Sequence, residues 1–364
     1  MTQGSRVTES DAMVIAIDAS EAARGRTSPN PPVGAVILDA DGVVVGVGST
    51  RPPGGPHAEV VALQRAGEKA QGGTAVVTLE PCNHTGRTGP CSRALIDAGI
   101  ARVVFAVSDP NPLAEGGART LAEAGVDVDS GLGAEDVSQG PLRAWLHKQR
   151  TGLPHVTLKY AASLDGRSAA EDGTSQWITG PDARAHVHAQ RAKLDAIVVG
   201  TGTVEADDPL LTARFPDGSN APHQPVRVVV GERDIPADAR IRNAEAPTLF
   251  VRTHDPRSVL EALSEHTDIL LEGGPQLAGA FLAAGVVDRI VAYIAPVVLG
   301  SGTAAVENAG VGTISDARRF RIESVRSLGS DIVVSAVPTR DGQAANHTAA
   351  NHTAANHSGL AEEE

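Results

Sequence analysis

The sequence predicts an α/β protein built of two successive domains, and three observations support that expectation. The chain has 364 residues, which is long enough for two separate cores. Apolar residues make up 41% of the chain but aromatic residues only 2%, so Val, Ile, Leu and Ala must fill those cores, as in α/β layers. Finally, short β-branched runs alternate with segments of helical spacing, and the alternation starts afresh near residues 151–154.

In the first half, small apolar residues recur at helical spacing from Asp11 to Arg24, with Ser10 or Asp11 as the expected N-cap. The proline-rich run 29–32 ends that helix. The next strands are expected at Val33–Leu38, Val43–Val47, Thr74–Leu79 and Val103–Val107, and the next helices at His57–Gly67 and Pro90–Ala98. The alternation continues to residue 128, which predicts a three-layer α/β domain over residues 1–150.

A second α/β domain is predicted over residues 151–337. Its strands are expected at Val156–Tyr160, Ala196–Val199, Val226–Val230, Thr248–Val251, Ile269–Leu271 and Ile290–Ile294, and its helices at Pro181–Lys193, Ser258–Glu265 and Leu277–Ala284. After Val337 a five-residue Ala-Ala-Asn-His-Thr repeat keeps no helical face together and cannot form a core. Residues 338–364 are therefore expected to be a disordered tail whose histidines have no functional metal role.

Charge and composition exclude several classes of protein. A formal net charge of −13 disfavours wrapping of nucleic acid, because phosphate neutralisation needs clustered Lys and Arg. The chain has no long apolar segment, so we expect no membrane partner. The polar start, Met1 to Asp11, lacks the apolar stretch of a signal peptide, and two cysteines make no disulfide framework. We expect a cytoplasmic protein with a small-molecule substrate.

The two cysteines and one histidine form a candidate metal centre. His57 is followed two residues later by Glu59, and Cys82 and Cys91 lie in one short segment after a predicted strand. One imidazole and two thiolates are three ligands for a tetrahedral zinc, which leaves the fourth position for water. Zinc lowers the pKa of bound water to about 7, and Glu59 is placed to move the protons of that water. The pattern predicts a hydrolytic zinc site of the deaminase type.

Two plainer interpretations remain open at this point. His57 could be an ordinary surface histidine, with both cysteines as small buried side chains. A structural zinc would instead need a fourth protein ligand, for which His84 is the candidate, and it would leave Glu59 without a task. The eight residues between Cys82 and Cys91 also differ from the two residues found in many zinc deaminases.

The segment between the cysteines is polar, flexible and cationic. His84, Arg87 and Thr88 can hold a phosphate beside the zinc, through side chains and backbone N–H groups. Asn30, in the proline-rich turn, offers an amide that can pair with the edge of a heterocycle. Together these residues indicate a phosphorylated heterocycle as substrate.

Three segments carry a family resemblance. The runs Pro29-Asn30-Pro31-Pro32-Val33-Gly34, His57-Ala58-Glu59 and Pro81 to Cys91 resemble the bifunctional riboflavin-biosynthesis deaminase/reductase family, in which the long cysteine spacing is usual. The resemblance implies a cytidine-deaminase-like fold for the first domain. It also implies hydrolytic deamination of 2,5-diamino-6-(5-phosphoribosylamino)pyrimidin-4(3H)-one to 5-amino-6-(5-phosphoribosylamino)uracil, with Glu59 as catalytic residue.

The second half contains two glycine-bearing turns after predicted strands, at Gly200-Thr201-Gly202 and at Gly273-Gly274. Such turns let backbone N–H groups approach a phosphate, as in dinucleotide binding. Alone the signal is weak, because the rest of the Rossmann fingerprint is missing, and bare glycine turns are often only turns.

These turns, taken with the runs 159–167, 175–179 and 200–214, resemble the reductase half of the same family. The resemblance implies a dihydrofolate-reductase-like fold and NADPH-dependent reduction of the ribosyl group to give 5-amino-6-(5-phosphoribitylamino)uracil. The residues expected to line NADPH are Ala161, Trp177, Thr203, Asp207, Gly274, Pro275, Gln276, Leu277, Ala278, Gly279 and Ala280. The residues expected to face the substrate are Lys159, Ser175, Arg191, Leu211, Arg214 and Glu272.

Particular roles follow for a few of these residues. Arg191 and Arg214 suit the 5-phosphate, and Lys159 and Asp207 suit the reacting carbon of the sugar. Glu232 stands where a small polar residue is expected. An acidic group there should repel the 2′-phosphate of NADPH and so weaken the preference for NADPH over NADH. The family also suggests a homo-oligomer formed through the reductase domain.

Two other functions remain as alternatives. One is a tRNA or nucleotide deaminase with an accessory domain, which the acidic charge and the long cysteine spacing oppose. The other is a zinc-binding protein without catalytic activity, against which Glu59, Asp207 and the two arginines argue.

Overall fold

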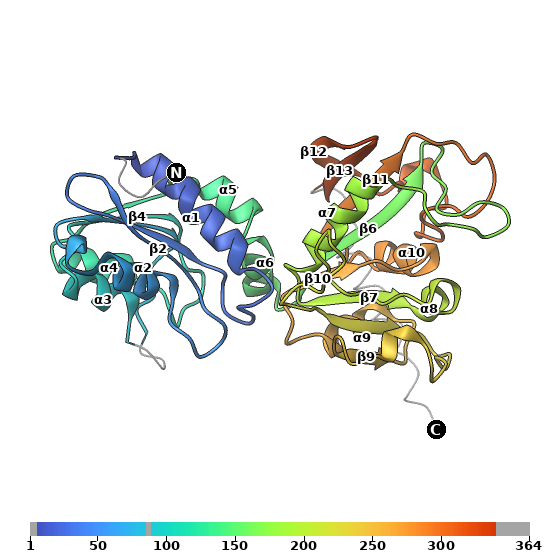
Figure 1. The fold of residues 1–364 in the computed structure, drawn as a ribbon, viewed down its shortest axis with the longest axis horizontal. Helices are drawn as coiled ribbons and strands as arrows, with labels where there is room; N and C mark the ends of the chain where they lie inside the picture. The colour runs from blue at the N-terminus through green and yellow to red at the C-terminus, as the bar shows by residue number, and fades with distance from the viewer. Residues whose placement is uncertain (1–5, 85–88, 340–364) are drawn as a thin grey trace, which may run out of the picture. The chain divides into compact units, whose positions relative to one another are not determined.

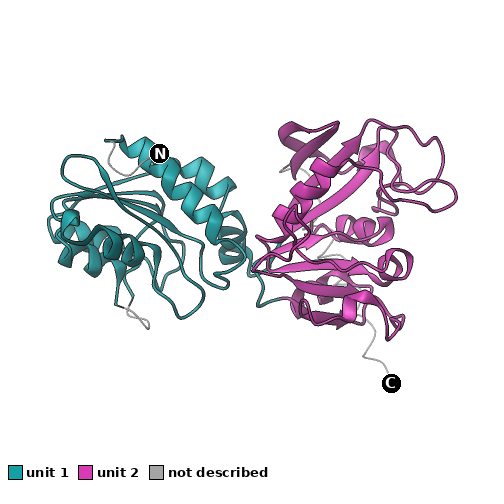
Figure 2. Ribbon diagram, in the orientation of Figure 1, with its two compact units in different colours: residues 1–155, 264–267 teal, residues 156–263, 268–364 magenta. Residues whose placement is uncertain are grey.

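A computed structural model describes residues 6–84 and 89–339 of the chain. The chain forms two compact units (Figures 1 and 2): residues 1–155 with 264–267 make unit 1, and residues 156–263 with 268–364 make unit 2. None of the described helices combines the length and the apolar character that a membrane crossing requires.

Unit 1 is built around a five-stranded sheet in the order β2-β1-β3-β4-β5. The strands are β1 (Gly34–Leu38), β2 (Val44–Ser49), β3 (Thr74–Leu79), β4 (Arg102–Val107) and β5 (Asp127–Ser130). The helices are α1 (Glu9–Ala23), α2 (Ala58–Ala66), α3 (Cys91–Asp97), α4 (Gly117–Glu123), α5 (Ala134–Gln139) and α6 (Arg143–Thr151), with a 3₁₀ turn at Gly67–Ala70. Because β3, β4 and β5 are parallel, the loops that follow them leave the same edge of the sheet.

Glycines let α1 and α2 pack on opposite faces of this sheet. A Cβ at Gly34 of β1 would overlap the carbonyl oxygen of Ala16 in α1. On the neighbouring strand, a Cβ at Gly48 would overlap the carbonyl oxygen of Ala58 in α2. Gly48 pairs with Ala35, the residue after Gly34, so the two glycines face opposite sides. The result is the expected three-layer arrangement, with backbone packed directly against backbone (Figure 1).

The start of α1 differs from the expectation. Ser10 and Asp11 both lie inside the helix, and Thr8 is the N-cap. The Thr8 hydroxyl accepts a hydrogen bond from the Asp11 amide at 3.1 Å, and the Asp11 carboxylate accepts one from the Thr8 amide at 3.0 Å. This reciprocal capping box satisfies two otherwise unpaired donors, which explains why the helix begins earlier than its apolar pattern.

Four residues from the second half of the chain, Ser264–Thr267, belong to unit 1. The Lys148 ammonium on α6 donates to the carbonyl oxygens of Ser264 at 2.7 Å and His266 at 2.9 Å. The backbone amide of His155 donates to the carbonyl oxygen of Thr267 at 2.9 Å. Unit 1 is therefore completed by a segment that follows it by more than a hundred residues.

Unit 2 contains an eight-stranded sheet in the order β12-β13-β11-β6-β10-β7-β8-β9. The strands are β6 (His155–Ser163), β7 (Ala196–Gly200), β8 (Val226–Val230), β9 (Thr248–Val251), β10 (Asp268–Leu271), β11 (Arg289–Ala295), β12 (Phe320–Leu328) and β13 (Asp331–Pro338). The helices are α7 (Pro181–Arg191), α8 (Thr201–Asp207), α9 (Pro256–Ala262) and α10 (Pro275–Ala283), with 3₁₀ turns at Arg240–Arg242 and Ile314–Asp316.

The strands β10, β7, β8 and β9 run parallel to one another. Their carboxyl ends therefore share one edge, where ligands bind in open α/β sheets. Proline occupies the first position of α7, α9 and α10, where its missing N–H costs no hydrogen bond. The hairpin β12–β13 and the short helices α4, α5, α6 and α8 were not among the elements expected from the sequence.

Candidate active sites

In unit 1, two helix starts and one strand end bring the candidate zinc ligands together. His57 is the N-cap of α2, Cys91 is the first residue of α3, and Cys82 follows β3. The Nδ1 atom of His57 lies 3.5 Å from Cys82 Sγ and 3.3 Å from Cys91 Sγ. The three ligand atoms all lie within 4.8 Å of one another, and both cysteines are free and buried.

These separations fit a tetrahedral zinc ion. Bonds of about 2.1 Å to nitrogen and 2.3 Å to sulfur, at tetrahedral angles, put nitrogen and sulfur about 3.5 Å apart. Among the described residues, His57, Cys82 and Cys91 are the only members of the group, and the exposed His84 lies outside it. Within that part of the chain the site has three protein ligands and no fourth, as a catalytic zinc requires.

The protonation of the site also suits a metal. The Cys91 thiol donates toward Cys82, and this contact together with His57 lowers the pKa of Cys82. The same contact, with burial and the nearby Glu59, raises the pKa of Cys91. The backbone amide of Cys91 also donates to Cys82 Sγ at 3.5 Å, so the start of α3 favours the thiolate. The surroundings thus favour one thiolate, and a bound cation would favour deprotonation of the second thiol.

Glu59 lies two residues into α2 and is only 4% exposed. Burial raises the pKa of its carboxyl to about 7, with a further contribution from the negative charge of Cys82. A carboxyl group with this pKa can both accept and return a proton near neutral pH.

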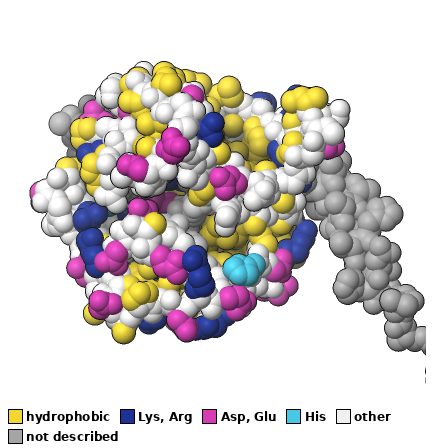
Figure 3. Space-filling model, turned by 90° about the vertical axis from the view of Figure 1, so that its right-hand side faces the viewer, with side chains coloured by type: hydrophobic (Ala, Val, Ile, Leu, Met, Phe, Trp, Pro, Cys, Tyr) yellow, Lys and Arg dark blue, Asp and Glu magenta, His cyan; other side chains and the backbone are white. Residues whose placement is uncertain are grey.

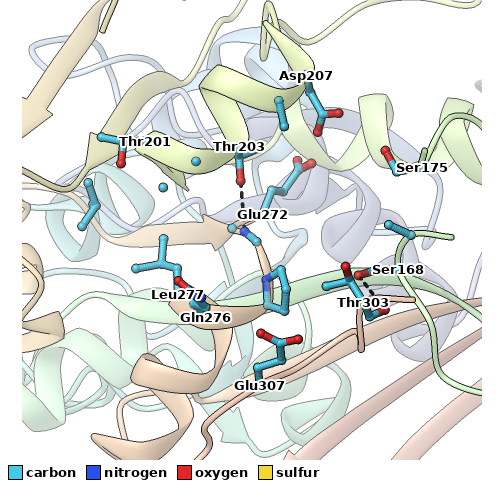
Figure 4. Close-up of a pocket in the computed structure, with 18 of the residues that line it drawn as sticks. Ser168, Ser175, Thr201, Thr203, Asp207, Glu272, Gln276, Leu277, Thr303 and Glu307 are labelled. Carbon is cyan, nitrogen blue, oxygen red and sulfur yellow. Dashed lines mark hydrogen bonds between the residues drawn. The ribbon is translucent and has the colours of Figure 1, made fainter. Parts of the chain in front are cut away.

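In unit 2, a cavity of about 720 Å³ opens at the carboxyl edge of the parallel strands (Figure 4). Its walls come from the ends of β7, β8 and β10, from the helices α8 and α10 that follow β7 and β10, and from the loops around Ser168 and Thr303. On the face of the molecule drawn in Figure 3 the surface is hollowed, with hydrophobic side chains inside and charged side chains of both signs around them. This is the size and character of a cofactor site.

Two family models match the chain, one to each half. Residues 6–107 match the cytidine and deoxycytidylate deaminase zinc-binding region, and residues 154–334 match the RibD C-terminal domain. The riboflavin biosynthesis protein RibD of Mycobacterium tuberculosis is 60% identical, over 90% of this chain and 96% of that protein. RibD of Escherichia coli is 41% identical, over 89% of this chain and 98% of that protein. The chain belongs to the RibD family.

Solved RibD structures agree. The Acinetobacter baumannii RibD structure superposes with a TM-score of 0.81 at 37% identity, covering 91% of this chain and 99% of that one. A Thermotoga maritima structure described as a diaminohydroxyphosphoribosylaminopyrimidine deaminase/5-amino-6-(5-phosphoribosylamino)uracil reductase gives 0.83 at 32% identity, over 91% and 99%.

The chain is thus a bifunctional deaminase and reductase of riboflavin biosynthesis, with a zinc-binding deaminase domain and an NADPH-dependent reductase domain. The expectations from sequence for the family, the fold, the activities and the cofactors are confirmed.

In the deaminase half, the structure describes two of the remaining predicted substrate residues and leaves two undescribed. Asn30 is half-buried in the turn after α1, where its backbone N–H donates to the Thr27 carbonyl oxygen at 2.8 Å. His84 is exposed. Arg87 and Thr88 lie outside the described residues, so their predicted phosphate contacts stay predictions.

For the reductase half, part of the predicted set lines the cavity. From the expected cofactor residues these are Thr203, Asp207, Gly274, Pro275, Gln276, Leu277 and Ala280, and from the expected substrate residues Ser175 and Glu272. The Thr203 hydroxyl accepts a hydrogen bond of 3.1 Å from the Gly274 amide, which ties α8 to the start of α10 (Figure 4).

The other predicted cofactor residues lie outside the lining of this cavity. Ala278 is buried in the core of unit 2. A Cβ at Gly279 would overlap the carbonyl oxygen of Glu307, so this glycine lets α10 pack closely on the loop 303–308. Ala161 is on β6, and Trp177 is 69% exposed with the Arg184 guanidinium 4.8 Å from its ring centroid.

Glu272 connects the cavity with two of the predicted substrate residues, Arg191 and Lys159. Its carboxylate accepts two hydrogen bonds from Arg191, at 2.7 and 2.8 Å, and Lys159 Nζ lies 3.8 Å away. Burial by itself would raise the pKa of Glu272, but the charges of Arg191 and Lys159 outweigh it and lower the pKa to about 2. This glutamate is therefore ionised throughout the neutral range, and Arg191 is already paired.

Arg214 and Leu211 lie on the loop after α8. Arg214 Nη2 is 3.4 Å from His188 Nε2, and its buried Nε has no hydrogen-bond partner among the described residues. The other nitrogen of His188, Nδ1, lies 3.1 Å from the Thr212 carbonyl oxygen, which can only accept. The ring is thus held with Nδ1 protonated and Nε2 turned to Arg214. Leu211 is buried with a left-handed backbone (φ 51°).

Sequence reasoning missed several residues that line the cavity: Ser168, Ala169, Gly173, Arg233, His254, Thr303 and Glu307. Most of them stand in loops without a motif. Arg233 carried one usable signal, because it follows the predicted strand Val226–Val230 by three residues.

Proposed function

We propose that unit 1 deaminates 2,5-diamino-6-(5-phosphoribosylamino)pyrimidin-4(3H)-one, and that unit 2 reduces the product to 5-amino-6-(5-phosphoribitylamino)uracil with NADPH. One observation supports the proposal above all: the same chain contains both sites. Unit 1 has three candidate zinc ligands close to the buried Glu59, and unit 2 has a cavity at the carboxyl ends of its parallel strands. The description of the Thermotoga maritima relative by both activities supports these substrates.

In the deaminase site, Glu59 is the proton carrier. Zinc, when held by His57, Cys82 and Cys91, supplies a water that is acidic enough to act as hydroxide at neutral pH. Glu59 accepts a proton from the attacking water and delivers it to the departing amine. The ring carbon gains the oxygen, the carbon–nitrogen bond breaks, and the amine leaves as ammonia. Burial of Glu59 supports this assignment, since it raises the pKa of the carboxyl to about 7.

In the reductase site, we assign NADPH to the cavity, with its pyrophosphate at the start of α10. Gly273 and Gly274 precede this nine-residue helix and leave its first N–H groups open to an anion. The Thr203–Gly274 hydrogen bond holds that turn in place. Ala161, Trp177, Ala278 and Gly279 are not among the residues that line the cavity, so their contacts with NADPH stay predictions.

NADPH supplies, when bound, the hydride that reduces C1′ of the ribosyl group. The overall reduction would place a hydride on C1′ and a proton on the ring oxygen, with the C1′–O4′ bond broken, so that the ring oxygen becomes a ribityl hydroxyl. Lys159 and Asp207 are the polar groups that we assign to this carbon. Arg214 is the better candidate for the 5-phosphate, because its Nε is unpaired whereas Arg191 already holds Glu272.

Three further assignments belong to this proposal. The domains are residues 1–150 and 151–337. The protein is cytoplasmic, in keeping with two free cysteines that stay reduced beside His57. It assembles through the reductase domain, where β12 and β13 carry the exposed apolar side chains of Ile322, Val325 and Ile332.

The test is to incubate the zinc-loaded full-length protein with the diaminopyrimidine ribotide, with and without NADPH. We expect ammonia release in both cases, and NADPH oxidation in proportion to the deaminated product. Chelation of zinc should stop ammonia release but leave NADPH oxidation with purified 5-amino-6-(5-phosphoribosylamino)uracil. Activity on cytidine, deoxycytidylate or tRNA in place of the ribotide would overturn the substrate assignment.

A further inference from the structure

One end of the reductase cavity is cationic. Arg233, just after β8, and His254, just after β9, both line the cavity, whereas Glu232 does not. We propose that Arg233, assisted by His254, binds the 2′-phosphate of NADPH and thereby sets the preference for NADPH over NADH. This inference rests on the proposed placement of NADPH in the cavity.

The strand order puts these groups at the correct distance from the pyrophosphate. Strands β10, β7 and β8 are neighbours, so β8 lies two strands from the strand that leads into α10. At about 4.8 Å per strand this is roughly 10 Å, a span that an adenosine ribose bridges. In dinucleotide-binding folds, an acidic residue contacts the 2′-hydroxyl of NAD, whereas a nearby arginine accommodates the 2′-phosphate of NADP.

The Arg233 side chain is directed across Gly202. A Cβ added at Gly202 would lie 3.1 Å from Arg233 Nη2, so the guanidinium rests over the turn that follows β7. Gly200, Thr201 and Gly202 also line the cavity there, which places the guanidinium beside the cofactor path. The absence of a side chain at Gly202 keeps that approach open.

Nearby acidic groups leave the guanidinium available. Glu205 Oε2 lies 2.5 Å from Arg233 Nη1, yet the Arg233 side chain is 60% exposed. A guanidinium has five N–H donors, so it can hold this carboxylate and a phosphate together. Asp234 is paired with Arg252, and Arg252 also donates to the backbone oxygen of Glu232 at 3.0 Å. Glu232 is not among the residues that line the cavity.

The experiment measures cofactor binding without substrate, by fluorescence titration of the zinc-loaded full-length protein with NADPH and with NADH. Arg233→Met keeps an unbranched apolar side chain and removes the guanidinium group. We expect the dissociation constant of NADPH to rise by about 10- to 100-fold and that of NADH to change by less than about 3-fold, since charge-assisted hydrogen bonds to phosphate are lost. Arg233→Lys should fall between the two.

The matched control is Arg252→Met, which removes the same charge from an exposed pair outside the cavity lining. It should leave both dissociation constants within about 2-fold of the parent protein. A second measurement needs no variant: 2′,5′-ADP should compete with NADPH better than ADP does, and added salt should weaken binding of NADPH more than that of NADH.

A bulky substitution at the start of α10 distinguishes a wrong placement of NADPH from a wrong role for Arg233. Gln276 is an exposed residue that lines the cavity, so Gln276→Trp should weaken both cofactors. If Gln276→Trp changes neither, the placement of NADPH in this cavity is wrong. If it weakens both while Arg233→Met leaves the NADPH-to-NADH ratio of the parent protein, the cavity stands and the role of Arg233 is overturned.

Discussion

Each unit has one glutamate with a nearly inaccessible side chain at its candidate site, and the pKa values of the two carboxyl groups shift in opposite directions. For Glu59 in unit 1, burial and the negative charge of Cys82 outweigh the opposing charge of His57 and raise the pKa to about 7. The side chain of Glu272 in unit 2 is also only 6% exposed, but Arg191 and Lys159 lower its pKa to about 2. Neighbouring charge, not burial, therefore decides whether a buried carboxyl exchanges protons.

The difference matches the chemistry of the two halves. Deamination needs a group that accepts and returns a proton, so a pKa near the working pH is useful. Reduction by hydride needs a fixed frame around the sugar and the cofactor, and a permanently ionised carboxylate with two bound cations provides one. The comparison leads to four predictions, in order of decreasing effect.

Glu59→Gln should have the largest effect and should separate the two activities. Loss of the proton carrier should lower ammonia release by about 10²- to 10⁴-fold, because general acid–base catalysis contributes on that scale. Zinc content should stay the same, since Glu59 is not among the three ligands. NADPH oxidation with the deaminated product should also be unchanged, and a parallel loss of it would contradict the separate roles of the two glutamates.

Glu272→Gln should act through stability. It leaves Arg191 and Lys159 buried without their counter-charge, which costs about 3–5 kcal/mol in the unfolding free energy of unit 2. Hydrogen exchange of unit 2 amides measures that loss, and unit 1 amides are the internal control.

The stabilisation of unit 2 by ionised Glu272 should also depend on pH. The carboxyl has a lower pKa when folded (about 2) than its ordinary value of 4.5, so its stabilisation is complete above pH 4.5 and disappears as the pH falls toward 2. The difference between the parent protein and Glu272→Gln should shrink over that range. A difference that stayed constant would mean that the ion pair does not stabilise unit 2.

Gly48→Ala should destabilise unit 1 by about 1–3 kcal/mol, since the new Cβ overlaps the backbone oxygen of Ala58 and must push α2 from the sheet. Because His57 caps α2, zinc affinity should fall as well. Gly89→Ala is the control for stability, because no described residue comes within 4 Å of its Cβ. Chemical denaturation and zinc titration measure both effects, and equal behaviour of the two variants would refute the close packing.

Arg102→Gln should have the smallest effect. Arg102 lies 2.7 Å from Glu9 and 3.3 Å from Asp129, but these carboxylates are partly or largely exposed. Exposed pairs contribute about 0–1 kcal/mol, so the loss should stay within that range and decrease further in salt. A loss comparable to that of Glu272→Gln would show that exposure does not separate the two networks.

The sequence predicted the deaminase site better than the reductase site for a physical reason. The zinc ligands are rare residue types, and two of them sit on one short loop, so the pattern survives without knowledge of the fold. The reductase cavity is assembled from loops between Ser168 and Glu307, and its walls include common residues such as Thr303 and Ala169. Only the strand order brings those residues together.

The elements show the same limit. The predicted strands Thr74–Leu79, Val226–Val230 and Thr248–Val251 have the observed bounds, because they are β-branched runs with clear ends. The outermost strand, β12, was missed since polar residues such as Arg321 and Ser324 interrupt its apolar positions, as is usual at a sheet edge. Helix α8 begins within the run Gly200-Thr201-Gly202, and the two glycines of that run predict a turn instead of a helix.

The segment Ser264–Thr267 has a practical consequence for anyone who wishes to produce one activity alone. A deaminase fragment that stops at residue 155 lacks the carbonyl oxygens that Lys148 and the His155 amide bind. Water would have to replace these carbonyl oxygens at the end of the fragment, where the chain frays most readily. Abolishing one activity by substitution, with the polypeptide left whole, is therefore the sounder way to study the other.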